Sequence, residues 1–88
     1  MSEWLYNIQL IIPSTAEGLN ECLDIVNDIS IKFDLDFEKT FALHTVLVEA
    51  VENAIIHGNR GIRDYTVRLD IRINFYQIFL EVEDQGNG

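Results

Sequence analysis

The sequence predicts an α+β fold, a two-layer sandwich in which a mainly antiparallel sheet is covered on one face by helices. Three segments alternate apolar and polar residues with the period of two that a half-buried strand requires. Between the first and second of them lie two segments whose apolar residues recur every three or four positions, as in amphipathic helices. The predicted order is therefore strand, helix, helix, strand, strand, within one domain spanning residues 1–88.

The first strand is expected over residues 6–12, and Pro13 ends it. Ser14 and Glu17 have the spacing of a capping box, which predicts that Ser14 caps the first helix. We expect this helix to run to about Phe33. Its apolar residues form one inner stripe: Leu19, Leu23, Val26 and Ile29.

The second helix is expected to start after Asp36, a plausible N-cap, and to continue to His57. Gly58 occupies the position of a C′ glycine that would end it. Two strands follow, over residues 67–73 and 78–83, with a tight connection that indicates an antiparallel hairpin. Their alternation predicts that one face of the sheet is wet and the other is covered by the two helices.

The charge balance limits the classes of partner that the chain is expected to bind. There are 15 acidic and 6 basic residues, a net charge of −9, and such a chain repels phosphate backbones and anionic membrane surfaces. We therefore expect no nucleic-acid and no membrane partner. Cys22 is the single cysteine and cannot form an internal disulfide, and no secretory signal or apolar spanning run is visible. These features favour a soluble, cytoplasmic protein.

Three polar residues of the second helix share one stripe. Glu49, Asn53 and His57 are spaced four apart, and at ~100° per residue they drift only about 80° around an α-helix. The stripe borders the apolar face, where a cleft could be partly dry and still admit a ligand. The alternative interpretation is a solvated face at a helix end, with His57 favoured there by the helix dipole.

A second motif follows the last strand directly. Parity places Asp84 in phase with the inward residues of that strand, and an inward carboxylate is costly unless it meets a hydrogen-bond donor such as an adenine amino group. Gly86 and Gly88 would let the backbone approach a flat ring closely. The alternative is an ordinary turn into another strand.

The two motifs together resemble those of the GHKL ATP-binding superfamily (Bergerat fold). Glu49-x-x-x-Asn53-Ala-x-x-His57 is similar to its N box, and Asp84-x-Gly86-x-Gly88 to its first glycine box. The early strand and helix and the phrase from Glu49 to Gly58 resemble most closely the anti-sigma-factor serine/threonine kinases. Sensor histidine kinases usually place a lysine and an aromatic residue at the end of the N box, and they carry an upstream phosphoacceptor helix.

The resemblance implies roles for the matched residues. Glu49 would be the general base, Asn53 would bind the Mg²⁺ that bridges the phosphates of ATP, and Asp84 would read the adenine. Gly86 and Gly88 would shape the pocket. His57 would line it.

The resemblance also implies a function. In its complete form the protein would bind a sigma factor and phosphorylate a serine of a STAS-type anti-sigma antagonist. Separately, we expect a homodimer, because an unfinished sheet leaves an unpaired edge with which a second copy can pair. The chain stops inside the first glycine box, so we expect the lid, a further strand and the closing helix to be missing and ATP affinity to be weak. A non-catalytic, nucleotide-regulated partner-switching module and a histidine-kinase ATPase domain are the alternatives, beside a plain α+β domain without a ligand.

Overall fold

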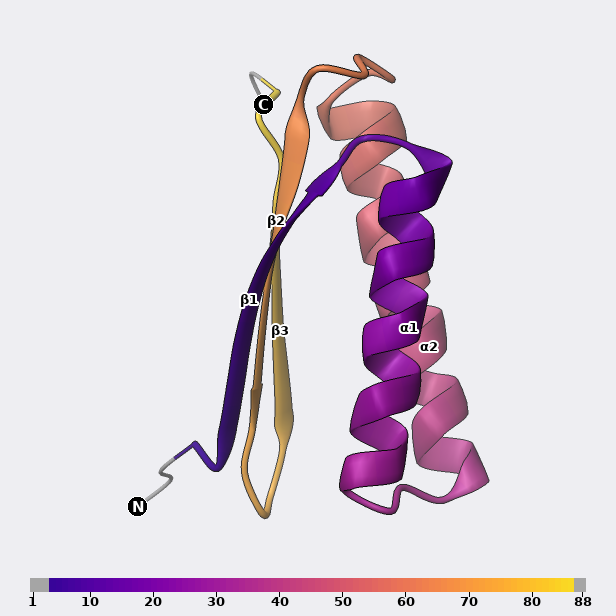
Figure 1. Ribbon diagram of the computed structural model, residues 1–88, viewed down its shortest axis with the longest axis vertical. Helices are drawn as coiled ribbons and strands as arrows, with labels where there is room; N and C mark the ends of the chain where they lie inside the picture. The colour runs from indigo at the N-terminus through magenta and orange to yellow at the C-terminus, as the bar shows by residue number, and fades with distance from the viewer. Residues whose placement is uncertain (1–3, 87–88) are drawn as a thin grey trace.

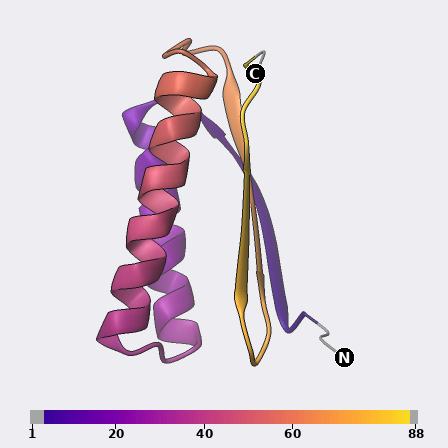
Figure 2. The ribbon, with the colours of Figure 1, turned by 180° about the vertical axis from the view of Figure 1, so that it is seen from behind.

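A computed structural model describes residues 4–86, which form a sheet on one side and a layer of helices on the other (Figure 1). The elements in chain order are β1 (Tyr6–Pro13), α1 (Ala16–Lys32), α2 (Phe37–Asn53), the single π-helical turn η1 (Ala54–Gly58), β2 (Thr66–Ile73) and β3 (Ile78–Glu83). Seen from behind, α2 lies in front of α1, and both helices lie on the same side of the sheet (Figure 2). The predicted α+β fold is confirmed.

The three strands of the described chain pair in the order β1-β2-β3, and both pairings are antiparallel. The register aligns inward residues across the sheet, with Ile8 opposite Ile71 and Ile71 opposite Leu80. Because β2 is central and covered by both helices, its inward side chains are almost fully buried, whereas those of the edge strand β3 are only half-buried. The buried apolar core comprises Ile12, Cys22, Val26, Ile29, Leu43, Leu47, Val51, Ala54, Val67, Leu69, Ile71 and Ile73.

The start of α1 differs from the predicted capping box. Thr15, not Ser14, is the N-cap, and its hydroxyl accepts a hydrogen bond from the backbone N–H of Gly18 at 3.3 Å. Ser14 is buried because its Oγ accepts a hydrogen bond from the Asn59 side chain at 2.6 Å. The prediction of Ser14 as the cap was therefore wrong, because a tertiary contact uses the hydroxyl that the local pattern assigned to the helix.

The start of α2 was predicted correctly and its end was not. Asp36 is the N-cap, and its Oδ1 accepts from the backbone N–H of Lys39 at 2.8 Å. The α-helix stops at Asn53 and continues as the π turn η1, so the expected α-helical run to His57 is wrong in its last turn. The left-handed residues that end the helix are Arg60 and Gly61, with φ of 55° and 70°, and not Gly58.

A four-residue loop, residues 74–77, closes the hairpin between β2 and β3. Asn74 organises this loop, because its Oδ1 accepts hydrogen bonds from the backbone N–H groups of Tyr76 at 2.8 Å and of Gln77 at 2.9 Å. An asparagine that caps its own turn in this way is a local determinant of hairpin geometry.

The outer face of the sheet is less open than its sequence alternation suggested. Asp70 is only 3% exposed there, because Arg72 donates to both its carboxylate oxygens, at 3.3 and 3.0 Å, and Gln9 donates at 3.2 Å. The guanidinium of Arg72 in turn lies over the ring of Phe79, 5.6 Å from the ring centroid. The hydrogen bonds from Arg72 lower the pKa of Asp70. Across the described part of the chain, no helix combines the length and apolar character needed to cross a bilayer.

Candidate functional site

The two sequence motifs come together at one end of the molecule. Glu49 and Asn53 lie on the last turns of α2, His57 lies in η1, and Asp84 directly follows β3. The end of the described chain after β3 lies close to the end of the helix in both ribbon views (Figures 1 and 2). The fold therefore brings the candidate N box and the candidate glycine box to the same edge of the sandwich.

Asp84 lies against the backbone of the helix end. A Cβ placed on Gly58 would overlap the Asp84 carboxylate, and one placed on Gly86 would overlap the Gly58 carbonyl. Glycine at both positions therefore permits the last described residues to pack directly on η1. Asp84 is half-buried and in phase with the inward residues of β3, as its parity predicted.

One oxygen of the Asp84 carboxylate already accepts a hydrogen bond. Its Oδ1 accepts from the backbone N–H of Gly86 at 3.0 Å, a bond that also fixes the turn after β3. An ionised carboxylate offers about four acceptor positions, so one such bond leaves capacity for a ligand donor such as an exocyclic amine. The position fits the role of adenine reader that the resemblance implies.

Asn59 belongs to this site, although the sequence analysis did not identify it. It is fully buried, and its Nδ2 donates to Ser14 Oγ at 2.6 Å and to the carbonyl of Thr66 at 2.9 Å. Its Oδ1 accepts from the backbone N–H of Gln85 at 2.7 Å. One side chain thus ties the helix end to the end of β1, the start of β2 and the segment that contains Asp84.

The π turn determines how the helix meets this segment. The backbone N–H of Asn59 donates to the carbonyl of Ala54 at 2.7 Å, and that of Gly61 to Ile55 at 2.9 Å. Such turns widen a helix by one residue and are frequent at functional sites. The α-helical rotation of ~100° per residue therefore holds from Glu49 to Asn53 but not on to His57.

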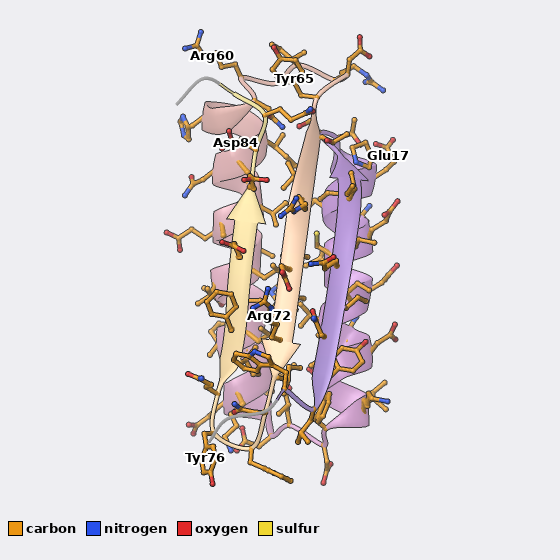
Figure 3. All side chains as sticks on the ribbon, turned by 90° about the vertical axis from the view of Figure 1, so that its left-hand side faces the viewer. Glu17, Arg60, Tyr65, Arg72, Tyr76 and Asp84 are labelled. Atoms are coloured by element: carbon orange, nitrogen blue, oxygen red, sulfur yellow. The ribbon has the colours of Figure 1, made fainter. Side chains whose placement is uncertain are left out.

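The side chains of Glu49, Asn53 and His57 are exposed on the helix surface. A small cavity of about 90 Å³ lies at this end, lined by Gly58, Asn59, Arg60, Ile62, Tyr65 and Gly86. It is smaller than the roughly 300 Å³ at which ligand pockets begin. Figure 3 shows Arg60, Tyr65 and Asp84 grouped at this end of the sheet. Convergence of Glu49, Asn53 and Asp84 on one nucleotide pocket stays a prediction, and Gly88 lies outside the described residues.

A magnesium ion would find few protein ligands here. No group of three or more histidine, cysteine, aspartate or glutamate side chains within residues 4–86 could hold a metal ion. Mg²⁺ bound with a nucleotide needs only one or two protein oxygens, since phosphates and water complete its octahedron. The exposed amide of Asn53 is compatible with that demand.

Arg60 supplies positive charge at an end where the motifs carry carboxylates. It is exposed and lines the small cavity beside Gly86. In a chain of net charge −9, a cation next to the glycine box is a local feature that would favour an anionic ligand. Sequence reasoning did not single it out, although it follows His57-Gly58-Asn59 directly.

Comparison with known proteins identifies the family. The family model of the histidine kinase-like ATPase domain matches residues 12–88, which is most of the chain. No curated protein matches the sequence significantly. The match begins at the end of β1 and spans both helices, the hairpin and both motifs whose meeting is described above. The chain belongs to the family of histidine kinase-like (GHKL) ATPase domains.

Proposed function

We propose that this chain is the nucleotide-binding part of an anti-sigma factor with ATP-dependent serine protein kinase activity. Domains of this family bind ATP. The observation that supports the more specific proposal is the packing of Asp84 against Gly58, at the end of the helix that bears Glu49 and Asn53. This arrangement supports the proposal because Asp84, which would read the adenine, lies beside the helix that bears the candidate base and the candidate metal ligand.

Nucleotide recognition would rest on Asp84. Its carboxylate would accept a hydrogen bond from the adenine amino group, and Gly86 would let the purine ring approach the backbone. Asn59 would hold the Asp84 segment in place through Gln85, because the bond between them is buried at the Asn59 end. Asn53 would contribute its amide oxygen to Mg²⁺, which would neutralise phosphate charge.

Glu49 would act as the base. In the transfer, the serine oxygen of the substrate protein would form a bond to the γ-phosphorus while the bond from phosphorus to the β,γ-bridging oxygen breaks and ADP departs. The hydroxyl proton would pass to the Glu49 carboxylate. Glu49 is exposed on α2, so a hydroxyl presented by a second protein can reach it.

The partners in this proposal are a sigma factor and a STAS-type anti-sigma antagonist, and the functional unit is a homodimer. The resemblance of the phrase from Glu49 to Gly58 to the anti-sigma branch supports these partners. Two other functions compete: a non-catalytic module whose partner binding is regulated by nucleotide, and the ATPase domain of a histidine kinase.

Nucleotide binding can be tested on the chain as it stands. NMR titration with ATP and Mg²⁺ detects weak binding, and shifts are expected at residues around Gly58 and Asp84. Asp84→Asn should abolish them, because an amide cannot replace the carboxylate as acceptor without presenting a donor. Asp64→Asn removes the same charge from an exposed loop residue and should leave the shifts unchanged.

Kinase activity is best tested on a chain extended beyond Gly88. Glu49→Gln should reduce phosphate transfer at least 100-fold, in line with the 10²–10⁴-fold contribution of a general base, and should leave sigma-factor binding intact. Glu52→Gln, on the same helix and also exposed, is the matched control. Transfer that survives Glu49→Gln would refute the role of the base, and an acid-labile phosphohistidine product would favour the histidine kinase.

A further inference from the structure

Strand β1 forms one edge of the sheet, and no strand within residues 4–86 pairs with its outer side. Its eight residues pair with β2 in continuous register, from Tyr6 opposite Ile73 to Pro13 opposite Thr66. The other edge is β3, and a further strand of the family's fold is expected beside it, because consecutive strands usually lie next to each other. β1 is therefore the edge that such a strand would leave open.

The main chain of β1 presents hydrogen-bonding groups along this edge. The N–H of Ser14 donates to the carbonyl of Tyr65 across the sheet at 3.2 Å. In an antiparallel ladder, residues that bond to one neighbour alternate with residues whose N–H and C=O groups point away from it. Asn7, Gln9 and Ile11 are out of phase with Ser14, so their N–H and C=O groups point away from β2 and toward the free edge.

β1 lacks the features that usually protect an edge strand. Charged side chains, prolines within the strand, bulges and short length discourage pairing with another chain. Residues 4–16 contain no charged side chain, although the chain has 15 acidic and 6 basic residues. The proline of β1 is its last residue, and Ile11 is 65% exposed on the outer face. The edge is thus long, uncharged and open to the addition of a strand.

Four carboxylates on α1 form a stripe beside this edge. They recur every three or four residues and are all exposed: Glu17, Glu21, Asp24 and Asp28. Lys32, one helical turn beyond Asp28, lies with its ammonium 5.5 Å from the centroid of the Tyr6 ring, so this side of α1 faces the start of β1. Figure 3 shows Glu17 beside the other end of β1. None of the four carboxylates forms a salt bridge in the described part of the chain.

The charge of this stripe favours a basic partner. A strand added to β1 would direct alternate side chains to the helix side of the sheet, next to α1. Lysine or arginine at those positions would face the carboxylates. Two copies of the chain paired through β1 would instead have both helix layers on one face, and the two acidic stripes would repel each other.

We propose that the free edge of β1 binds a basic, extended segment of a partner protein by strand addition. The main chain of this segment would form hydrogen bonds with Asn7, Gln9 and Ile11. Its basic side chains would face Glu21 and Asp28, and the apolar side chains between them would lie beside Ile11 on the outer face. This surface is separate from the Gly58–Asp84 end, so the proposal does not depend on the proposed kinase function.

The test is NMR titration of the chain with an eight-residue peptide, the length of β1, in which lysine alternates with valine. Saturable shifts and slower amide hydrogen exchange are expected at Asn7, Gln9 and Ile11, and the affinity should fall as salt is raised. A peptide with glutamate in place of lysine should not bind. Methylation of the backbone amides of the lysine peptide should abolish binding, because strand addition requires their hydrogens, and this change leaves the protein unaltered.

Charge variants test the role of the stripe. Glu21→Gln combined with Asp28→Asn should weaken binding of the lysine peptide about fivefold, the equivalent of two exposed ion pairs. Glu38→Gln combined with Glu52→Gln removes the same charge from exposed residues of α2 and should have little effect. This control separates the stripe from the general attraction of a cation to a chain of net charge −9.

Three results would overturn the proposal: no saturable shifts on β1, equal affinity for the glutamate or the methylated peptide, or equal effects of the two double variants. Sedimentation without peptide tests the competing occupant. Self-association that Ile11→Pro abolishes would assign the edge to a second copy and would also overturn the proposal, because this proline removes an N–H of the free edge and leaves the bonds to β2 in place.

Discussion

Replacing Asn59 with alanine tests whether one side chain holds the candidate site together. The substitution removes three hydrogen bonds of a buried side chain, to Ser14, Thr66 and Gln85. Each is worth about 1 kcal/mol net, so the free energy of unfolding should fall by about 3 kcal/mol. A domain of 88 residues has a total of roughly 4–13 kcal/mol, so the loss is a large fraction of its stability.

The measurement is urea unfolding followed by circular dichroism. With a slope of about 1 kcal/mol per molar urea, the midpoint should fall by about 3 M or the variant should be unfolded without denaturant. Asn27→Ala, at an exposed position of α1, is the matched control and should leave the midpoint unchanged or raise it. If the free energies of unfolding of the two alanine variants agree within about 0.5 kcal/mol, the hydrogen bonds of Asn59 do not contribute the stability assigned to them.

Two further predictions concern other elements. Asp36→Ala removes the N-cap of α2 and should lower the free energy of unfolding by about 1 kcal/mol in the same urea assay. Glu38→Ala, two residues further in the first turn, should cost less, and equal losses would contradict the capping role. Asp70 has a lowered pKa in the folded state because of Arg72, so its contribution is present above the unfolded pKa near 4 and is lost as pH falls through the folded value. Asp70→Asn should therefore flatten the acid limb of the stability–pH profile, and an unchanged slope would refute the linkage.

The sequence was sufficient for features that repeat or act locally. Alternation placed β1, β2 and β3 and their inward faces, and a single aspartate, Asp36, marked the start of α2 correctly. The parity of Asp84 was also read correctly, because strand periodicity carries past Glu83 for one more residue. Each of these depends on neighbours in sequence only.

Features that depend on residues far apart in the sequence were not predicted. The hydroxyl of Ser14 looked like a helix cap, but Asn59, 45 positions away, donates a hydrogen bond to it and leaves the cap to Thr15. Asp70 looked like a solvated strand residue, yet Arg72 and Gln9 bury it. In the candidate site, Asn59 carried no local signal beyond its place after a helix end.

The extra residue of the π turn has a consequence for how the ATPase site can tolerate variation. Residues Ala54–Gly58 accommodate one residue more per turn than an α-helix does, and this surplus sets the depth at which the Gly58 carbonyl meets Gly86. The spacing between Asn53, the candidate metal ligand, and the segment that contains Asp84 therefore depends on the winding of the main chain in this turn. An insertion or deletion in this turn would change that spacing, whereas a substitution at the exposed Ile56 would not.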